Sequence, residues 1–443
     1  MNYASYLAKM TLAALLLWGC SNDPTIDGAD TGSDTAGKQD TRFEPEDSSS
    51  GGYDGESQDD SSRSPDVRPA EDVRDREDIS EEPLQCDAPL ANCSGDVSDG
   101  CSTNLSEDSE HCGRCNRSCR GGACVDERCE PVLIATGQAK PTKLTVDDEF
   151  IYVATQPTYA GHRNASVMRV PLTGGVFKHF TDEDMPYIDD IKYLDGEIYF
   201  RIMNDIEGIY LLDRESGSRS LATENPATGW WDLMDFILVS GDFFVADGSH
   251  GRIWRSLPAG SPLVLSSEEN GPTFVRHHDG YLYWADRNVD NTGTPGPLRV
   301  RRAHLASEQL DTLATIPASQ FEFSGMAIYG DHVYFSTSGM EFYGGAIQRQ
   351  SLSPGPAPQP LVIEENYPRY VAVSDAGVFW HSYSDDIAST PHRLRHLTHG
   401  ATEPINLARF SKRIWDLHVE EDALYVLEAR LDDNEFSVYR IMP

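Results

Sequence analysis

The stretch His277–Asp286, HHDGYLYWAD, combines two histidines with two aspartates within ten residues. Histidine and carboxylate side chains are common zinc ligands and proton carriers, so this stretch could bind a metal or transfer protons. The alternative is that it is one copy of a repeated structural unit that carries histidines incidentally. The two interpretations differ in what the rest of the chain should contain, because a structural unit would recur.

A second histidine-rich segment, HRLRHLTHG, carries His392, His396 and His399. In a strand His392 and His396 would lie on one face, whereas His399 would lie on the other face or in a turn. Metal chelation is one interpretation, but solvated strand and turn histidines fit better. The sequence contains no nucleophile elbow, phosphate-binding loop, dinucleotide fingerprint or HExxH motif.

The elements that carry these residues form a repeat. An alternating apolar run, a turn and an aliphatic–aromatic pair recur seven times after about residue 131, and successive copies lie 39 to 51 residues apart. A period near 45 residues is typical of a β-propeller with one four-stranded sheet per copy. The second aromatic residues of the pairs are Tyr152, Tyr199, Phe244, Tyr283, Tyr334, Phe379 and Tyr425.

The two ends of the repeat predict how the ring closes. The last copy has no fourth strand before the chain ends at Pro443, whereas a spare strand, Pro131–Gly137, precedes the first copy. Pairing these two would leave no free sheet edge at the seam. We therefore predict an all-β fold, with a seven-bladed propeller over residues 131–443 that an N-terminal strand closes.

The repeat also changes the interpretation of the opening stretch. Asp279 and Gly280 align with the hairpin turns of the other copies, and His277 and His278 stand where other copies have Tyr193 and Leu194. The histidines are thus predicted to be local substitutions on the fourth blade. The segment YLYWAD resembles the Tyr-Trp-Thr-Asp motif of receptor-type propellers, and FFVAD, ending at Asp247, resembles it more weakly, but the remaining blades do not repeat the acidic residue.

The central funnel of a propeller is where carboxylates could meet. Gluconolactonases and paraoxonases are propellers that bind calcium on oxygen ligands from several inner strands, and a similar site here would use Asp190, Asp235 and Glu322. A register error of one residue would turn these side chains away from the funnel. We expect no cofactor, with calcium as the alternative.

Aromatic residues near the predicted blade loops are candidates for a binding face, because stiff aromatic side chains are typical of binding surfaces. The alternative for each is packing between neighbouring blades. The candidates are Trp230, Trp231, Tyr343 and Tyr383.

The N-terminus has the pattern of an export signal. A basic residue, Lys9, precedes a short apolar run, which is too short to span a bilayer. The segment LLWGC resembles a bacterial lipobox and predicts a signal peptide over residues 1–19 with lipid attached at Cys20. The residues after the cysteine favour the outer membrane by the usual sorting pattern. The alternative is an ordinary secretory signal.

Residues 20–85 are predicted to be an acidic, disordered tether. Between Ser21 and Gln85 there are 20 acidic and 6 basic residues, and few apolar ones that could form a core. The whole chain has a net charge of −36, which argues against a nucleic-acid partner and against electrostatic attachment to anionic lipids.

Residues 86–130 hold the remaining eight cysteines of the chain. In an exported protein this density predicts structural disulfides rather than zinc or redox chemistry, although the sequence leaves the pairing open. The segments DGCSTNL, EHCGRC and CVDERC resemble Cys-rich surface lipoproteins of myxobacteria and related deltaproteobacteria, which implies an exported surface protein. The cysteines are Cys86, Cys93, Cys101, Cys112, Cys115, Cys119, Cys124 and Cys129.

Together these features predict a lipid-anchored protein of the outer membrane, on the cell surface or else on the periplasmic face. Its propeller is expected to bind protein, peptide or glycan without catalysis. The alternatives are a calcium-dependent hydrolase or lactonase with its site in the funnel, and a structural envelope component similar to the propeller of the Tol system.

Overall fold

The computed structural model describes fourteen stretches of the chain. They are residues 84–157, 163–182, 184–203, 208–224, 233–248, 250–256, 262–286, 296–317, 321–339, 344–353, 355, 357–383, 392–430 and 434–443. All of them belong to one compact unit, Ser80–Pro443. The predicted signal peptide, Cys20 and nearly all of the predicted tether lie outside the described residues. No helix within the described ranges has the length and apolar character needed to cross a membrane.

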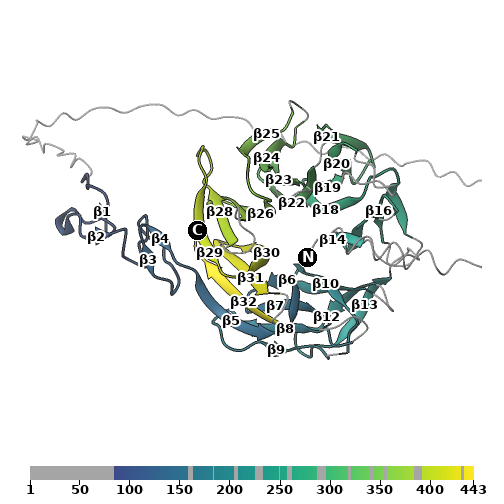
Figure 1. The fold of residues 1–443 in the computed structure, drawn as a ribbon, viewed down its shortest axis with the longest axis horizontal. Coiled ribbons are helices and arrows are strands. Elements are labelled where there is room, and N and C mark those ends of the chain that lie inside the picture. Colours follow the sequence, from purple (N-terminus) through teal and green to yellow (C-terminus); the bar gives the residue numbers. More distant parts are fainter. Residues whose placement is uncertain are drawn as a thin grey trace, which may run out of the picture. The chain divides into compact units, whose positions relative to one another are not determined.

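Seven four-stranded antiparallel sheets lie around a common axis, so the predicted seven-bladed propeller is confirmed (Figure 1). In six of the sheets the strands follow chain order from the axis outward, and in the seventh the early strand β5 follows β32 at the outer edge. Blade 1 consists of β6 Lys140–Val146, β7 Phe150–Gln156, β8 Val167–Pro171 and β9 Lys178–His179. Blade 2 consists of β10 Ile188–Leu194, β11 Glu197–Ile202, β12 Gly208–Leu212 and β13 Arg219–Glu224. Blade 3 consists of β14 Leu233–Val239, β15 Asp242–Asp247, β16 Arg252–Arg255 and β17 Leu263–Ser266.

The remaining four blades have the same order, and the last of them contains an early strand of the chain. Blades 4 and 5 are β18 Pro272–His278, β19 Tyr281–Asp286, β20 Leu298–His304 and β21 Leu310–Ile316; and β22 Phe321–Tyr329, β23 His332–Gly339, β24 Gly345–Ser351 and β25 Gln359–Ile363. Blades 6 and 7 are β26 Arg369–Ser374, β27 Gly377–Ser382, β28 His392–Leu397 and β29 Ile405–Phe410; and β30 Arg413–Glu420, β31 Ala423–Arg430, β32 Glu435–Ile441 and β5 Val132–Gln138.

Strand β5 closes the ring, as the sequence predicted. It pairs antiparallel with β32, and Gly137 lies opposite Phe436. The Phe436 ring is fully buried and packs at 5.0 Å from the ring of Phe177, on the segment before β9. The two ends of the propeller are thus held together by backbone hydrogen bonds and by an aromatic contact.

The core lies between the blades and is built from the second strand of each sheet. All the residues of β15 and β27 are buried, as are five of the six residues of β19. Trp254, Trp284 and Trp380 are among the largest side chains with essentially no exposure. The strands read as continuous apolar runs because both of their faces contact neighbouring sheets.

The inner hairpins use tight turns at the positions that the repeat predicted. At Asp279 and Gly280 the φ angles are 48° and 75°, and at Asp195 and Gly196 they are 51° and 85°. Two successive positive φ values are the geometry of a type I′ turn, which matches the twist of the strands on either side.

A disulfide-bonded segment precedes β5. It contains the short strands β1 Leu90–Ala91, β2 Thr103–Asn104, β3 Cys124–Val125 and β4 Arg128–Cys129, and a 3₁₀ turn, η1 Val97–Asp99. Its bridges are Cys86–Cys101, Cys93–Cys115, Cys112–Cys124 and Cys119–Cys129. Cys112 and Cys115, which form a C-x-x-C pair in the sequence, bond to different partners.

The disulfide-bonded segment packs against blade 7. Cys112, Cys119, Cys124 and Cys129 belong to one apolar cluster with residues of β5, β31 and β32. Arg117 Nη2 donates a hydrogen bond of 3.1 Å to the backbone oxygen of Met442. The segment therefore shares its core with the blade at which the ring closes.

Candidate functional site

The axis of the propeller is a channel of about 530 Å³, lined by residues of all seven inner strands. Every inner strand has a shift in its register with the second strand near its start, for example between Ile188 and Asp190 and between Ile414 and Asp416. An extra residue at such a bulge changes the direction of the side chains that follow it. The bulges thus determine which inner-strand side chains enter the channel.

Charged side chains in the channel pair between neighbouring blades. Lys143 Nζ on blade 1 lies 3.0 Å from Asp416 Oδ1 on blade 7, and the Leu144 amide donates to the other oxygen of Asp416 at 3.1 Å. The partly buried Lys143 ammonium is balanced by this carboxylate, which helps to raise the pKa of Lys143 against the opposing effect of burial. This pair joins the first blade to the last.

Asp235 carries a second inter-blade network. Its carboxylate forms an ion pair with Lys192 of blade 2 and lies 2.8 Å from Arg276 Nη1 of blade 4. Burial raises the pKa of Asp235, but the Lys192 and Arg276 charges outweigh it and hold the value at about 2. Asp235 is therefore ionised at neutral pH and engaged by two cations.

The other two calcium candidates also line the channel. Asp190 is buried and places a carboxylate oxygen 3.7 Å from Lys192 Nζ, whereas Glu322 enters from β22 on blade 5. Burial is the largest influence on Asp190 and raises its pKa. Asp190 and Asp235 are brought to the same lysine, and no separate cage of oxygen ligands forms around them.

Metal-ligand geometry occurs at one place in the described stretches. The Sγ atoms of Cys112, Cys119 and Cys129 lie within 4.8 Å of one another, but each of these sulfurs is in a disulfide. Calcium takes six to eight oxygen ligands around one point. The described carboxylates of the channel do not offer such a set.

The opening stretch HHDGYLYWAD is structural in this fold. His277 is exposed next to the hairpin turn, and no metal-ligand cluster of the described residues includes it or His278. Asp286 at the far end is fully buried, accepts a hydrogen bond from the Asn270 amide and pairs with Arg299. Burial, and then the nearby Glu269 charge, raise the pKa of Asp286 to about 6.

The histidines of HRLRHLTHG have separate partners. His396 stacks on Phe379 at 4.6 Å, and His399 bonds to the Ser374 backbone oxygen. His392 Nδ1 lies 3.1 Å from Nε2 of His381. The three rings therefore do not converge on one metal ion.

The pair His381–His392 belongs to a group of aromatic and basic side chains on blades 6 and 7, here called the blade 6–7 cluster. Tyr383 lies in it, and its ring is 4.8 Å from His381 and 5.4 Å from Tyr367. Of the four aromatic candidates for a binding face, Tyr383 is the one that the structure describes, and it is buried. Trp230, Trp231 and Tyr343 lie outside the described residues. The cluster consists of Tyr367, Arg369, His381, Tyr383, His392, Arg413 and Trp415.

The sequence did not predict that the residues of the blade 6–7 cluster lie together, and Tyr367, His381 and Arg413 were not among its candidates. Arg369, Arg413 and Trp415 are near the starts of inner strands that neighbour each other only in the folded ring. The signal available in the sequence was the density of aromatic and basic residues in YPRY, ending at Tyr370, and in KRIW, ending at Trp415.

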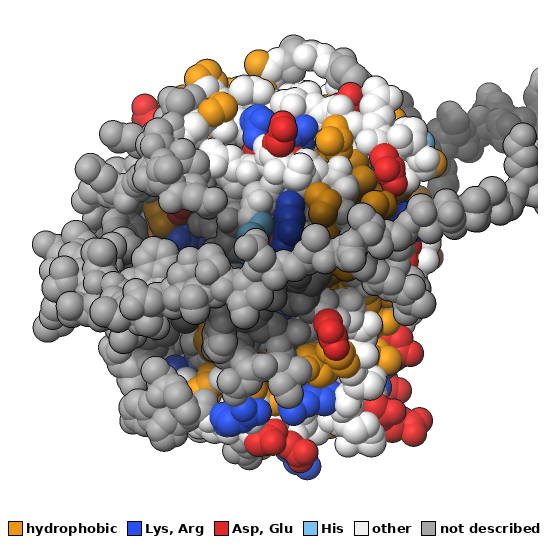
Figure 2. Space-filling model, turned by 90° about the vertical axis from the view of Figure 1, so that its right-hand side faces the viewer, with side chains coloured by type: hydrophobic (Ala, Val, Ile, Leu, Met, Phe, Trp, Pro, Cys, Tyr) orange, Lys and Arg blue, Asp and Glu red, His pale blue; other side chains and the backbone are white. Residues whose placement is uncertain are grey.

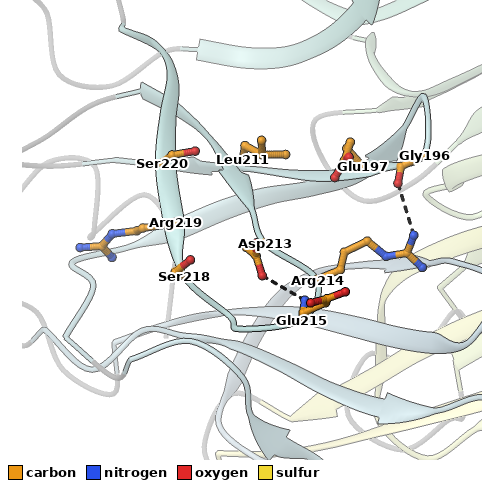
Figure 3. Close-up of a pocket in the computed structure, with 9 residues that line it drawn as sticks. All are labelled: Gly196, Glu197, Leu211, Asp213, Arg214, Glu215, Ser218, Arg219 and Ser220. Carbon is orange, nitrogen blue, oxygen red and sulfur yellow. Dashed lines mark hydrogen bonds between the residues drawn. The ribbon is translucent and has the colours of Figure 1, made fainter.

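A second pocket, of about 420 Å³, lies on blade 2 beside the turn that joins β12 to β13 (Figure 3). Its arginine, Arg214, bonds to the backbone oxygen of Gly196 and forms ion pairs with Asp147 and Asp148. These bonds tie blade 2 to blade 1. Asp213, which also lines this pocket, accepts hydrogen bonds from the backbone of the same turn.

The described part of the face drawn in Figure 2 has acidic, basic and hydrophobic side chains interspersed. It therefore does not show a single large patch of one charge.

No protein-family description matches the chain, and no curated protein does. Several solved structures are similar in fold. A computationally designed protein, Ika8, is 10% identical with a TM-score of 0.45, and the match covers 67% of this chain and 84% of that one. The nidogen/laminin complex is 13% identical with a TM-score of 0.39, covering 59% and 92%. The extracellular domain of a one-component system from B. thetaiotaomicron is 12% identical with a TM-score of 0.47, covering 70% and 39%.

Proposed function

We propose that the chain is an exported surface protein, anchored to the outer membrane by lipid on Cys20, whose propeller binds protein, peptide or glycan without catalysing a reaction. The observation that supports binding over catalysis is the pairing of the channel carboxylates with cations. Asp235 is engaged by Lys192 and Arg276, and Asp416 by Lys143. A carboxylate held in this way is a poor ligand for calcium.

Export is supported by the four disulfides of residues 86–129, because such bridges persist in oxidising compartments. The lipid anchor itself depends on the LLWGC segment. Its test is Cys20→Ser in the full chain. Loss of the protein from the membrane fraction would support the anchor, and unchanged partitioning would remove it.

Binding is tested with arrays of peptides and of glycans, probed with the full chain. We expect saturable binding to at least one class of array member, with the same binding when calcium is chelated. The competing hydrolase hypothesis is tested in parallel with lactone and ester substrates. Turnover that requires calcium would overturn the proposal, and so would the absence of binding to every array member.

A further inference from the structure

The blade 6–7 cluster contains two arginines that have no acidic partner among the described residues. Arg369 and Arg413 begin neighbouring inner strands, and neither forms an ion pair with any residue that the structure describes. The Nε atoms of both are buried and have no hydrogen-bond partner. Other arginines of the blades pair with carboxylates, whereas Arg169 packs on rings without an ion pair among the described residues. Five of these pairs are Arg201 with Asp189, Arg252 with Asp247, Arg276 with Asp235, Arg299 with Asp286, and Arg301 with Glu269.

Aromatic rings hold the two guanidinium groups in place. The guanidinium carbon of Arg413 lies 4.8 Å from the centre of the Trp415 ring and 5.6 Å from that of Tyr383. The guanidinium of Arg369 lies 4.6 Å from the centre of the Tyr367 ring and donates a 2.6 Å hydrogen bond to its hydroxyl. Contact with a ring satisfies the charge in part, but it leaves N–H donors at the edge of the guanidinium free to bind an anion.

The histidine pair adds a third unpaired group. His381 has no exposed surface, its Nε2 faces His392, and its Nδ1 has no partner among the described residues. In the tautomer in which His392 donates, His381 Nδ1 carries the hydrogen and is a donor. Burial, then His392, then the charges of Arg413 and Arg369 hold the pKa of His381 well below its ordinary value. The ring is therefore neutral and adds no positive charge to those of the two arginines.

We propose that the blade 6–7 cluster binds a single carboxylate group, presented by the end of a peptide. This proposal rests on the proposed binding function and names the chemistry that the site recognises. The planar fork of an arginine matches a carboxylate, with two parallel hydrogen bonds. A peptide end brings one negative charge, whereas an acidic polysaccharide brings many, and a chain with a net charge of −36 repels the second more strongly.

The test compares N-acetyl-Gly-Gly, which has a free carboxylate, with its C-terminal amide, by ligand-observed NMR titration against the full chain. We expect the acid to bind and the amide to bind at least about tenfold more weakly, since hydrogen bonds to charged groups are among the stronger ones. Equal binding of the two, or binding of neither, would overturn the proposal. Glucuronate is the second arm, and binding of glucuronate but not of the peptide would overturn the assignment to a peptide end.

Variants place the binding at the cluster. Arg413→Gln should weaken binding of the acid about tenfold or more. Arg413→Lys keeps the charge but not the planar guanidinium, so its affinity for the acid should lie between those of Arg413→Gln and the natural protein. Arg409→Gln is the matched control, because it removes the same charge from an exposed position on β29. Unchanged binding in Arg413→Gln would overturn the proposal.

Two readouts separate the possible failures. If Arg413→Gln does not fold, the protection of the natural protein against heat by the acid and not by the amide still tests carboxylate binding. If the arrays show binding that Arg413→Gln and Arg369→Gln leave unchanged, the proposed function stands and the carboxylate site is wrong.

Discussion

Closure of the ring can be tested at Gly137. This glycine of β5 lies opposite Phe436 of β32, and the φ angle of Gly137 is not in the left-handed region. A Cβ atom placed on Gly137 would lie 3.0 Å from Phe436 Cε2 and closer still to Cζ and Cε1. The phenylalanine ring cannot move aside easily, because it is fully buried and packs on Phe177. Gly137→Ala should therefore force the closing strand and this ring apart.

The expected size follows from two opposing effects. Alanine restricts the unfolded chain and would stabilise the fold by about 0.4–1 kcal/mol at a position with ordinary backbone geometry. Forcing an extra methyl group into a packed core costs about 1–3 kcal/mol. We expect the free energy of unfolding of Gly137→Ala to fall by about 1–2 kcal/mol, measured by urea denaturation.

Two further variants sharpen the test. Gly355→Ala is the control, because Gly355 is exposed and a Cβ there meets one atom at an ordinary 3.7 Å. Its stability should change by no more than about 0.5 kcal/mol. In Gly137→Ala combined with Phe436→Leu, the shorter side chain should relieve part of the overlap, so the double variant should be more stable than the sum of the single effects predicts. If Gly137→Ala is as stable as the natural protein, the ring of Phe436 does not lie against this strand.

Two more predictions concern the channel and the disulfide-bonded segment. Because the pKa of Asp235 is lowered to about 2 from an unfolded value of 3.8, its charge stabilises the fold above about pH 4, and this is lost as the pH falls toward 2. The shift corresponds to about 2 kcal/mol, so Asp235→Asn should lower the free energy of unfolding by at least that much at pH 7, because Lys192 and Arg276 lose their partner. This difference in stability from the natural protein should shrink in acid. An equal difference at pH 7 and pH 3 would contradict the prediction. Replacing Cys119 and Cys129 together by serine opens a loop of 10 residues and should destabilise the disulfide-bonded segment by about 3 kcal/mol. The segment should then be cleaved more readily in limited proteolysis. Protease resistance equal to that of the natural protein would refute this prediction.

The sequence predicted the blades well because every copy of the repeat meets the same packing requirements. Each second strand is apolar on both faces, since it lies between neighbouring sheets, and each inner hairpin needs a tight turn such as Asp279–Gly280. These requirements act within about ten residues and return in every copy. The spare strand before the first copy was identified because a missing fourth strand at the end of the chain requires one.

The disulfide pairing could not be predicted in the same way. Spacing along the chain favours no one connectivity among eight cysteines, and Cys112 and Cys115, which are close in sequence, bond to different partners. The pairing follows from which cysteines face the apolar cluster shared with blade 7. Cys112, Cys119, Cys124 and Cys129 are all buried there and pair among themselves, and that arrangement depends on contacts with residues more than 300 positions away.

The channel shows why residue type alone is a weak guide to a site in a propeller. The predicted calcium ligands were Asp190, Asp235 and Glu322, because each lies near the start of an inner strand. Asp190 lies near Lys192, on its own strand. The fold also places Lys192 and Arg276 of the two adjacent blades beside Asp235, so this charge is balanced across the blade boundaries. Pairs of this kind join residues about 40 or about 270 positions apart, and no local spacing reveals them.

Among the described residues, an unbalanced positive charge remains in the blade 6–7 cluster. Several partly buried arginines of this acidic chain pair with a carboxylate of their own blade, as Arg252 does with Asp247. An arginine that packs on aromatic rings without such a partner therefore needs an explanation.

Arg369 and Arg413 are two such arginines on adjacent inner strands, and Arg169 is another, on the rings of Phe150 and Phe180. What distinguishes the first two is that they lie together, beside a buried histidine with a nitrogen that has no partner among the described residues. A structural role alone would be served by one more acidic residue at this boundary. Its absence among the described residues favours an anion that arrives with the ligand, and that ligand is then recognised by its charge at the mouth of a channel whose own charges are already paired.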